Sequence, residues 1–410
     1  MQERINSLDF LRGIAVLGIL IINIESFAFP IQFSPYLYGF ASELDTTVRF
    51  WVYYLAQGKF FTMFVVLFGV SFYLMLERLQ EKYKTKNVFG IYTRRLFILF
   101  IFGAVHTYFI WSGDILHHYA ICALLLFPVR SFTMRGLIIF IVAMLLIILG
   151  SSFEKVQKRQ QQKLAYQQAI TVDKKDRTNI QDRTVWRWES KLEKKSTERY
   201  DDKEKTKKGS YLDNLQSNWG DVKLYKGELF FNIILFDSLM LMAIGILLYR
   251  LGIFSDYRSV PYYWLITFVL FALGLWTGFI KYQWWSYDYL NPIVDVYREI
   301  INKISYYIQG VSYLLLINGI YQAIPNIRKL TAINKVGKMA LTSYIFHSIV
   351  CALIFYGYGL NYHNELNRSE LIWLVIAIWP LNILFCHYWL KYNKQGPLEF
   401  IWRKLSYRVD

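Results

Sequence analysis

The chain has 410 residues, of which 55% are hydrophobic and 19% aromatic, and it carries a formal net charge of +16. This composition is too apolar for an ordinary soluble protein, and the chain is too long for one small domain. Much of the positive charge lies in short segments between apolar runs, where membrane orientation and lipid headgroups explain it better than nucleic acid does. The three cysteines, Cys122, Cys351 and Cys386, lie in apolar segments without CxxC spacing and imply neither a disulfide framework nor a zinc site.

The pattern of apolar segments predicts an all-α polytopic membrane protein with about ten transmembrane helices. The second segment contains Gln57, Gly58 and Lys59, which predicts an interfacial or re-entrant piece followed by the span itself. The predicted spans cover residues 10–29, 50–76, 95–111, 115–129, 136–151, 229–249, 262–280, 303–323, 337–357 and 371–390.

The basic residues of the short loops predict that both termini face the cytoplasm. The short loops 31–48 and 112–114, on the other side, contain acids and no Lys or Arg. The chain then divides into helices one to five in residues 1–150, an extracytoplasmic charged loop in residues 151–226 and helices six to ten in residues 227–410. The basic positions on the cytoplasmic side are Arg4, Arg12, Arg78, Lys82, Lys84, Lys86, Arg94, Arg95, Arg130, Arg135, Arg250, Arg258, Arg328, Lys329, Lys335, Lys338, Lys391, Lys394, Arg403, Lys404 and Arg408.

The charged loop is basic, but long loops cross a membrane regardless of their charge. Its text KRQQQKLAYQQA (residues 158–169) predicts a helix that extends out of the fifth span. The few apolar residues of the loop argue against a core of its own. Two interpretations stay open: a solvated spacer, and a lid or docking surface for an anionic wall polymer.

The first span differs from a plain anchor because it carries Asp9, Arg12, Asn23 and Glu25. Charge within a membrane needs a partner or water. Arg12 and Asn23 are eleven residues apart, which places both on one face of a helix, about 16 Å apart along its axis. This spacing favours a site that spans most of the membrane. The alternative is that Asp9 and Arg12 reach the cytoplasmic surface while Asn23 bonds a neighbouring helix.

The tightest polar cluster is HTYFIWSGDILHHY, from His106 to Tyr119. Ser112 and Gly113 form the turn, and Asp114 is expected either to cap the next helix through the backbone near His117 or to orient a histidine. A neutral histidine beside a carboxylate is the usual equipment for taking a proton from a hydroxyl group. His106 is the better base candidate because it lies within the span, although a histidine that is satisfied by a neighbouring helix fits the same position.

Other polar residues on the apolar spans are Lys59, His118, Asp237 and His347. Asp237 is expected to pair with Lys59 or Arg49, because an unpaired carboxylate in a membrane is costly. Ser343, one turn before His347, is expected to satisfy that ring. His117 and His118 are adjacent and point in different directions, and the sequence has no HExxH, Walker, GxGxxG or GxSxG motif, so no metal is expected.

Five blocks of the sequence resemble the YeiB-like family, also called domain of unknown function 418. The resemblance covers both halves of the chain, with residues 151–226 as the variable part. The blocks are NSLDFLRGIAVLGILIINI near the N-terminus, GKFFTMFVVLFGVSF (58–72), YTRRLFILFIFGAVHTYFIWSGDILHHYA (92–120), GKMALTSYIFHS (337–348) and GPLEFIWRKLSY (396–407).

The YeiB-like family is grouped with transmembrane acyltransferases, so the resemblance implies about ten helices and transfer of an acyl group, usually acetyl from acetyl-CoA, to extracytoplasmic glycans. Several of those relatives carry Arg and, eleven positions on, His on the first helix, whereas this chain has Arg12 and Asn23. An asparagine is no general base, so a base must come from elsewhere. By the family pattern His106 and Asp114 match the recurring His and the Asp of GDIL, and His347 stands where Gln is more frequent.

The resulting hypothesis is an acyltransferase of the bacterial cytoplasmic membrane. Arg12 would contact the phosphates of acetyl-CoA or another acyl-CoA, and His106, oriented by Asp114, would deprotonate a glycan or envelope acceptor. Asn23, Lys59, His118, Asp237 and His347 would line the donor and acceptor sites; membrane lipids are the other partners. Two alternatives are a transporter or flippase whose buried charges line a path, and a scaffold whose outer loop recruits partners.

Overall fold

The computed structural model describes residues 5–30, 42–83, 88–193, 197–226, 235–286 and 292–407, and within these ranges every regular element is a helix. The predicted all-α class is therefore confirmed. The basic positions Arg4, Lys84, Lys86 and Arg408, and the first residues of the predicted span 229–249, lie outside the described residues.

The N-terminal part of the bundle holds the first five predicted spans. Each falls on helix, although the second is two helices, and the fifth is a 37-residue helix that continues past the predicted end. The elements are α1 (Asn6–Ala28), α3 (Glu43–Leu55), α4 (Lys59–Tyr83), α5 (Val88–Phe109), α6 (Leu116–Leu126), the 3₁₀ helix η1 (Phe127–Ser131) and α7 (Met134–Ile170).

The C-terminal part of the described residues supplies the other five predicted spans and four shorter helices, η3, α14, α15 and α18. Here too each predicted span falls on helix in the described residues. The elements are α11 (Leu235–Arg250), η3 (Tyr257–Ser259), α12 (Tyr263–Ser286), α13 (Pro292–Ala323), α14 (Pro325–Arg328), α15 (Thr331–Lys338), α16 (Ala340–Phe355), α17 (Arg368–Tyr392) and α18 (Pro397–Ser406).

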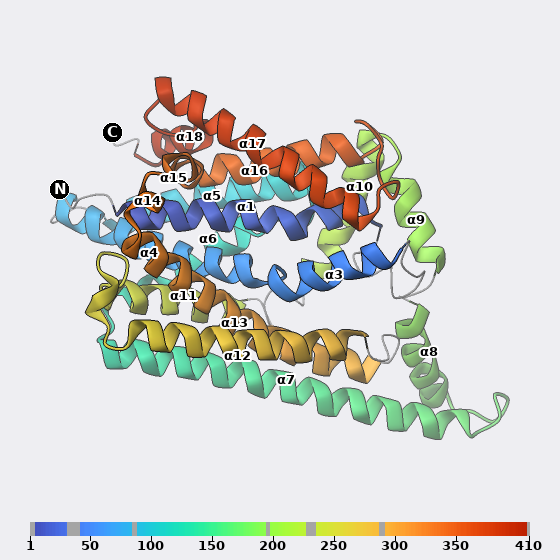
Figure 1. Cartoon of the computed structure of the whole chain (residues 1–410). Helices are drawn as coiled ribbons and strands as arrows, with labels where there is room; N and C mark the ends of the chain where they lie inside the picture. The colour runs from blue at the N-terminus through green and yellow to red at the C-terminus, as the bar shows by residue number, and fades with distance from the viewer. Residues whose placement is uncertain are drawn as a thin grey trace.

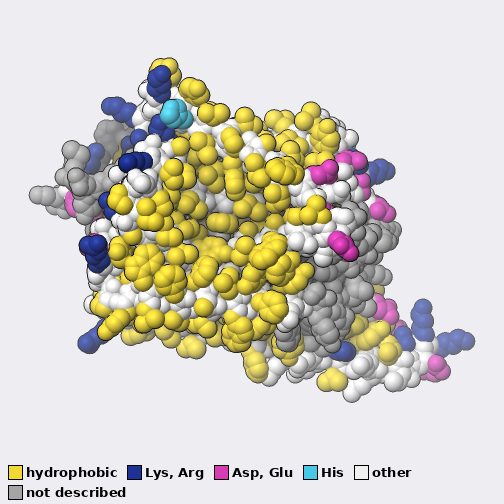
Figure 2. Space-filling view, in the orientation of Figure 1, with side chains coloured by type: hydrophobic (Ala, Val, Ile, Leu, Met, Phe, Trp, Pro, Cys, Tyr) yellow, Lys and Arg dark blue, Asp and Glu magenta, His cyan; other side chains and the backbone are white. Residues whose placement is uncertain are grey.

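Helix α1 runs through the middle of the bundle and packs on α4, α13, α15, α16 and α17 (Figure 1). In the apolar 18-residue stretch of α1, 67% is buried, whereas in the corresponding stretch of α7 only 17% is buried. Helices α7, α12 and α17 present exposed side chains such as Ile139, Phe268 and Trp373. This apolar surface covers the middle of the molecule (Figure 2) and is the surface that a lipid environment requires.

Six helices of the described residues are long and apolar enough to cross a membrane, or seven if the bent pair α15–α16 counts as one span. They make the chain a multi-pass membrane protein. The 11-residue α6 and the 16-residue α11 are shorter than the roughly 20 residues that a span needs, so the count of ten stays a prediction.

The second predicted span is broken where the sequence predicts a break. Helix α3 ends at Leu55, α4 begins at Lys59, and Gly58 between them has φ +82°, a backbone angle that favours glycine. Gly58 also packs on the ring of Tyr306, where a Cβ would lie 2.2 Å from ring carbons. A second sharp bend, of 85°, separates α15 from α16.

Charged side chains gather at the two ends of the bundle. Lys and Arg lie at the end that holds both chain termini, and Asp and Glu are prominent at the other (Figures 1 and 2). We call these the basic end and the acidic end. The distribution agrees with the predicted orientation, in which the basic end faces the cytoplasm.

The charged loop forms helices at the acidic end: α8 (Asn179–Glu193), α9 (Thr197–Lys207) and α10 (Tyr211–Lys226). Helix α10 packs on the last turn of α5, where the Tyr211 hydroxyl donates to the Phe109 carbonyl and Trp219 contacts Tyr108. The Gly357 amide donates to the Lys207 carbonyl at 2.9 Å. Helices α9 and α10 therefore contact the bundle.

We predict that Gly337→Ala destabilises the fold, because a Cβ there would lie 1.7 Å from the Asp9 carbonyl oxygen, where α15 crosses α1. Such overpacking costs about 1–3 kcal/mol or more. The matched control is Gly150→Ala in α7, where a Cβ meets nothing within 4 Å. Thermal unfolding of the purified proteins checks this, and equal midpoints for the two variants would contradict the close α1–α15 contact.

Candidate functional site

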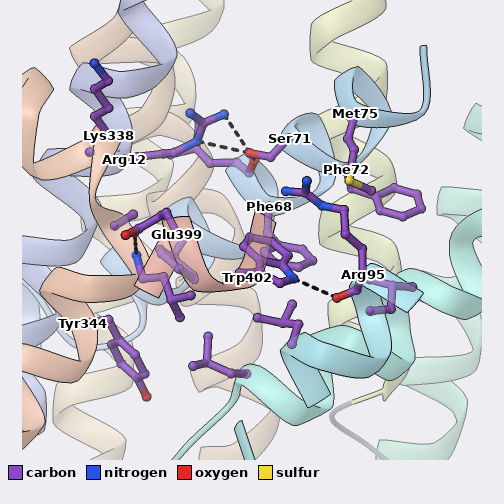
Figure 3. A pocket seen from close by; sticks show the side chains of 18 residues that line it. Arg12, Phe68, Ser71, Phe72, Met75, Arg95, Lys338, Tyr344, Glu399 and Trp402 are labelled. Atoms are coloured by element: carbon purple, nitrogen blue, oxygen red, sulfur yellow. Dashed lines mark hydrogen bonds between the residues drawn. The ribbon is translucent and has the colours of Figure 1, made fainter. Parts of the chain in front are cut away.

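A cavity of about 250 Å³ opens at the basic end and runs between α1, α4, α5, α16 and α18 (Figure 3). Its walls are mostly apolar, and its charged groups come from both halves of the chain. The lining residues are Arg12, Phe64, Leu67, Phe68, Ser71, Phe72, Met75, Arg95, Leu96, Leu99, Leu116, Gly337, Lys338, Ala340, Leu341, Tyr344, Glu399 and Trp402.

Three cationic side chains, Arg12, Arg95 and Lys338, line this cavity. We call it the donor cavity, because the sequence-based hypothesis places the acyl donor at Arg12. Arg12 donates to Ser71 Oγ at 2.8 and 3.1 Å and pairs with Asp9 at 2.8 Å. The guanidinium of Arg95 lies 4.4 Å above the ring of Trp402, and its buried Nε has no hydrogen-bond partner among the described residues. The cavity thus offers guanidinium and ammonium groups to an anion at its basic side.

Helix α18 closes one wall of the donor cavity. The Glu399 carboxylate accepts from the Leu341 and Thr342 amides at 2.9 and 3.1 Å, which fastens α18 to the first turn of α16. The Trp402 indole donates to the Arg95 carbonyl at 2.8 Å (Figure 3). Burial raises the pKa of Glu399 by more than the hydrogen bonds from Thr342 lower it.

Tyr344 lines the donor cavity and joins it to the histidine cluster. Its ring packs edge-on against His106, with ring centroids 5.3 Å apart. His106 Nδ1 lies 2.7 Å from Asp114 Oδ1, and both side chains are almost completely buried. His106 Nε2 is buried and has no hydrogen-bond partner among the described residues. The ring therefore has one nitrogen held by a carboxylate and the other left for a further group.

Asp114 contacts both His106 and the turn between α5 and α6. Its Oδ2 accepts from the Leu116 amide at 2.9 Å and lies 3.1 Å from His117 Nδ1. Asp114 is therefore a partner of two histidines, and it also accepts from the first amide of α6, although the N-cap residue of that helix is Ile115. The carboxylate has little freedom to rotate, because both its oxygens are engaged.

Asn23 and His347 line one small cavity, of about 10 Å³, with Tyr344 as a shared wall to the donor cavity. His347 Nε2 is buried without a hydrogen-bond partner among the described residues. The expected contact with Ser343 is wrong, because the Ser343 hydroxyl faces Cys386 Sγ at 3.3 Å instead. Arg12 and Asn23 thus border two cavities that meet at Tyr344.

Lys59 lies away from the donor cavity, in the region between α4, α12 and α13. Its Nζ and that of Lys281 both donate to the Tyr53 carbonyl, at 3.1 and 2.7 Å, and both ammonium groups lie over the ring of Tyr306. Both lysines are buried. The nearby Arg49 pairs with Glu25 at 3.2 Å, and Arg368 lies 3.5 Å from the other oxygen of Glu25.

Asp237 and His118 also lie apart from His106. Asp237 pairs with Lys303 at 3.1 Å and accepts from the Tyr307 hydroxyl at 2.6 Å, so the expected pairing with Lys59 or Arg49 is wrong. His118 Nε2 lies 2.9 Å from Ser238 Oγ, on the opposite side of α6 from the contacts of His117. The described residues contain no group of three or more His, Cys, Asp or Glu placed to hold a metal ion.

Five residues of the donor cavity have no role in the sequence-based hypothesis: Arg95, Lys338, Tyr344, Glu399 and Trp402. Arg95 and Lys338 count there only as orientation signals. All five lie in the sequence blocks 92–120, 337–348 and 396–407. Their presence in those blocks is the signal that would have found them.

Comparison with known proteins divides the chain into two matched parts. Residues 4–175 match the family model described as "Heparan-alpha-glucosaminide N-acetyltransferase, catalytic", and residues 248–409 match "Protein of unknown function (DUF418)". The first part contains Arg12, His106 and Asp114, and the second contains Lys338, Tyr344 and Glu399.

Two bacterial proteins are similar over the whole chain. YeiB of Escherichia coli K12 is 29% identical, with 100% of this chain and 97% of YeiB aligned. YxaH of Bacillus subtilis 168 is 26% identical, with 99% and 95% aligned. Both are described as uncharacterized proteins, and no solved structure matches the chain.

We predict that Glu25→Gln destabilises the protein by about 3–5 kcal/mol, because it removes the buried carboxylate charge that contacts the guanidinium groups of Arg49 and Arg368. The matched control is Glu365→Gln, which removes the exposed pair with Lys208 and should change stability little, because water screens that pair. Urea or thermal unfolding in detergent measures both. A Glu25 variant as stable as the control would show that this charge cluster does not support the fold.

Proposed function

Since the chain is related to the YeiB-like family along its length and to transmembrane acyltransferases, we propose that it transfers an acyl group, such as acetyl, from acyl-CoA to a glycan or envelope acceptor. The observation that carries this proposal is the donor cavity, which has cations near one end and the buried His106–Asp114 pair beyond Tyr344 at the other. The match of residues 4–175 to an acetyltransferase catalytic model supports acetyl-CoA as the donor.

The acyl-CoA donor would enter from the cytoplasmic side of a bacterial plasma membrane, which is the side that the basic end faces in the predicted orientation. Arg12, Arg95 and Lys338 would contact its phosphates, because guanidinium groups bind phosphate bidentately. The narrow apolar part of the cavity, with Phe64, Phe68 and Leu99 among its walls, would take the pantetheine arm and lead the thioester toward Tyr344.

His106 is the proposed general base. With Asp114 on Nδ1, its Nε2 would take the proton of an acceptor hydroxyl or amino group as that group attacks the thioester carbonyl. Collapse of the tetrahedral intermediate would break the carbon–sulfur bond, and the proton held by His106 would pass to the departing CoA thiolate. Asp114 would stabilise the imidazolium that forms between these two steps.

Asn23 and His347 would serve the acceptor, since their small cavity adjoins Tyr344. The Asn23 amide can hold a carbonyl oxygen or a sugar hydroxyl, and this role needs no titration. Lys59, Asp237 and His118 are engaged elsewhere in the bundle, and we do not include them in this reaction.

We predict that wild-type protein binds acetyl-CoA and that Arg95→Gln weakens this binding about tenfold, because one charge-assisted contact is lost. Arg12→Gln should weaken it less, since Asp9 already neutralises part of that charge. Lys404→Gln, at an exposed position of the same α18 that does not line the cavity, is the control. Calorimetry with folded, detergent-purified protein measures the three affinities. Absence of binding by wild type would overturn the donor assignment and favour the transporter alternative.

We predict that His106→Gln abolishes acyl transfer, by at least about 100-fold, while acetyl-CoA affinity stays within about twofold of wild type, because the base acts only in the chemical step. Asp114→Asn should lower the rate as well. Transfer is measured with radiolabelled acetyl-CoA and envelope material from the host cell, and alkaline treatment of the product separates a labile ester from a stable amide. Full transfer by the His106 variant would exclude this base.

A further inference from the structure

A second cavity lies at the basic end and shares no lining residue with the donor cavity. Its volume is about 1050 Å³, and it is bounded by the first turn of α1, the ends of α4, α11 and α13, and by η3, α14 and α15. We call it the arginine cavity. It is roomier than the donor cavity and mostly polar, so it suits a hydrated or ionic ligand rather than an acyl chain.

Three arginines from three different elements line the arginine cavity: Arg78 from α4, Arg258 from η3 and Arg328 from α14. None of them forms an ion pair with a carboxylate among the described residues. The single acidic lining residue, Asp256, uses its Oδ1 to accept from the Arg258 amide at 3.0 Å and so caps η3. The lining therefore has three exposed positive groups against one negative group, an excess that favours an anion.

The floor of the arginine cavity is held by the protein's own hydrogen bonds. Ser7 Oγ donates to the Phe254 carbonyl at 2.7 Å. The Gln322 side chain donates to the Ile253 carbonyl at 2.7 Å and accepts from the Tyr257 amide at 2.8 Å. These contacts hold the backbone before Arg258 against α1 and α13, and the Arg328 guanidinium donates to the Tyr321 and Gln322 carbonyls at the end of α13.

One polar group in the lining of the arginine cavity lacks a hydrogen-bond partner among the described residues. Asn334, on α15, lines the arginine cavity, and its Oδ1 is buried and accepts no hydrogen bond among the described residues. A buried amide oxygen without a donor costs free energy. A ligand that supplies an O–H or N–H group would remove that cost.

We propose that the arginine cavity binds a phosphate ester that also carries a hydroxyl or amino donor. Phosphate fits the arginines because their planar forks contact its oxygens bidentately, and the donor fits Asn334 Oδ1. Two sources have this chemistry: a phospholipid headgroup of the adjoining leaflet, and a soluble phosphate ester. The proposal does not depend on acyl transfer, because the two cavities share no residue.

The test uses the full chain in an uncharged detergent and three probes: dioctanoyl phosphatidylglycerol, dioctanoyl phosphatidylmethanol and glycerol 3-phosphate. The first two carry the same charge, but only phosphatidylglycerol has hydroxyl donors. The cavity variant is R78Q/R258Q/R328Q, and the control is R135Q/K329Q/K404Q, which removes three exposed basic charges that line neither cavity. Affinity is measured by calorimetry at low salt and at about 0.15 M salt.

We expect the cavity variant to bind phosphatidylglycerol at least about tenfold more weakly than wild type, and the control to change by less than about twofold. Equal losses in both variants would show that surface potential alone attracts the headgroup and would overturn the site. Absence of binding of all three probes by folded wild type would overturn it as well.

Asn334→Ala tests the donor part of the proposal. We expect this variant to bind phosphatidylglycerol several-fold more weakly than wild type and to bind phosphatidylmethanol equally well, since only phosphatidylglycerol has a hydroxyl group for Asn334 Oδ1. An equal effect on both lipids would overturn the proposed hydrogen bond between the headgroup hydroxyl and Asn334. Glycerol 3-phosphate identifies the source: competition at comparable affinity assigns a soluble ester, and competition by the lipids alone assigns the membrane.

Discussion

The carboxylate of Glu25 contacts the side chains of Arg49, Tyr53 and Arg368 in a part of the bundle from which water is excluded. A charge in such a place is stable only when an opposite charge and hydrogen bonds surround it. Because Glu25 is on α1, Arg49 on α3 and Arg368 on α17, this requirement ties together three helices that are far apart in sequence. The same requirement is met by Lys303 for Asp237, which joins α13 to α11, and by His106 and His117 for Asp114 at the turn between α5 and α6.

The donor cavity depends on both halves of the chain. Arg12, Arg95 and the His106–Asp114 pair come from the part that matches an acetyltransferase catalytic model, whereas Lys338, Tyr344 and Glu399 come from the part that matches DUF418. Helix α18 links the two parts, since Glu399 fastens it to α16 while the Trp402 indole donates to the Arg95 carbonyl of α5. Neither half encloses the cavity alone, because its lining residues come from both.

The basic end has two cavities of different character. In the donor cavity the charge of Arg12 is partly balanced by Asp9, and the walls are mainly apolar, as a long, flexible thioester requires. In the arginine cavity no described carboxylate pairs with Arg78, Arg258 or Arg328. The basic loops that orient a membrane protein therefore also contain specific geometry, because folding brings arginines from separate loops to one cavity.

The sequence by itself determined the all-α class, a helix at each predicted span and the break at Gly58, and it offered a contact between Asp114 and a histidine as one of two interpretations. These features are local: hydrophobic runs form helices, glycine permits the turn, and a short hairpin brings residues eight positions apart together. Only the tertiary structure decided that Asp237 pairs with Lys303, that Lys59 lies beside Lys281, and that Glu399 caps α16. Each of these contacts joins helices more than 50 residues apart, and their choice among possible partners depends on helix rotation and crossing angle, which no local pattern encodes.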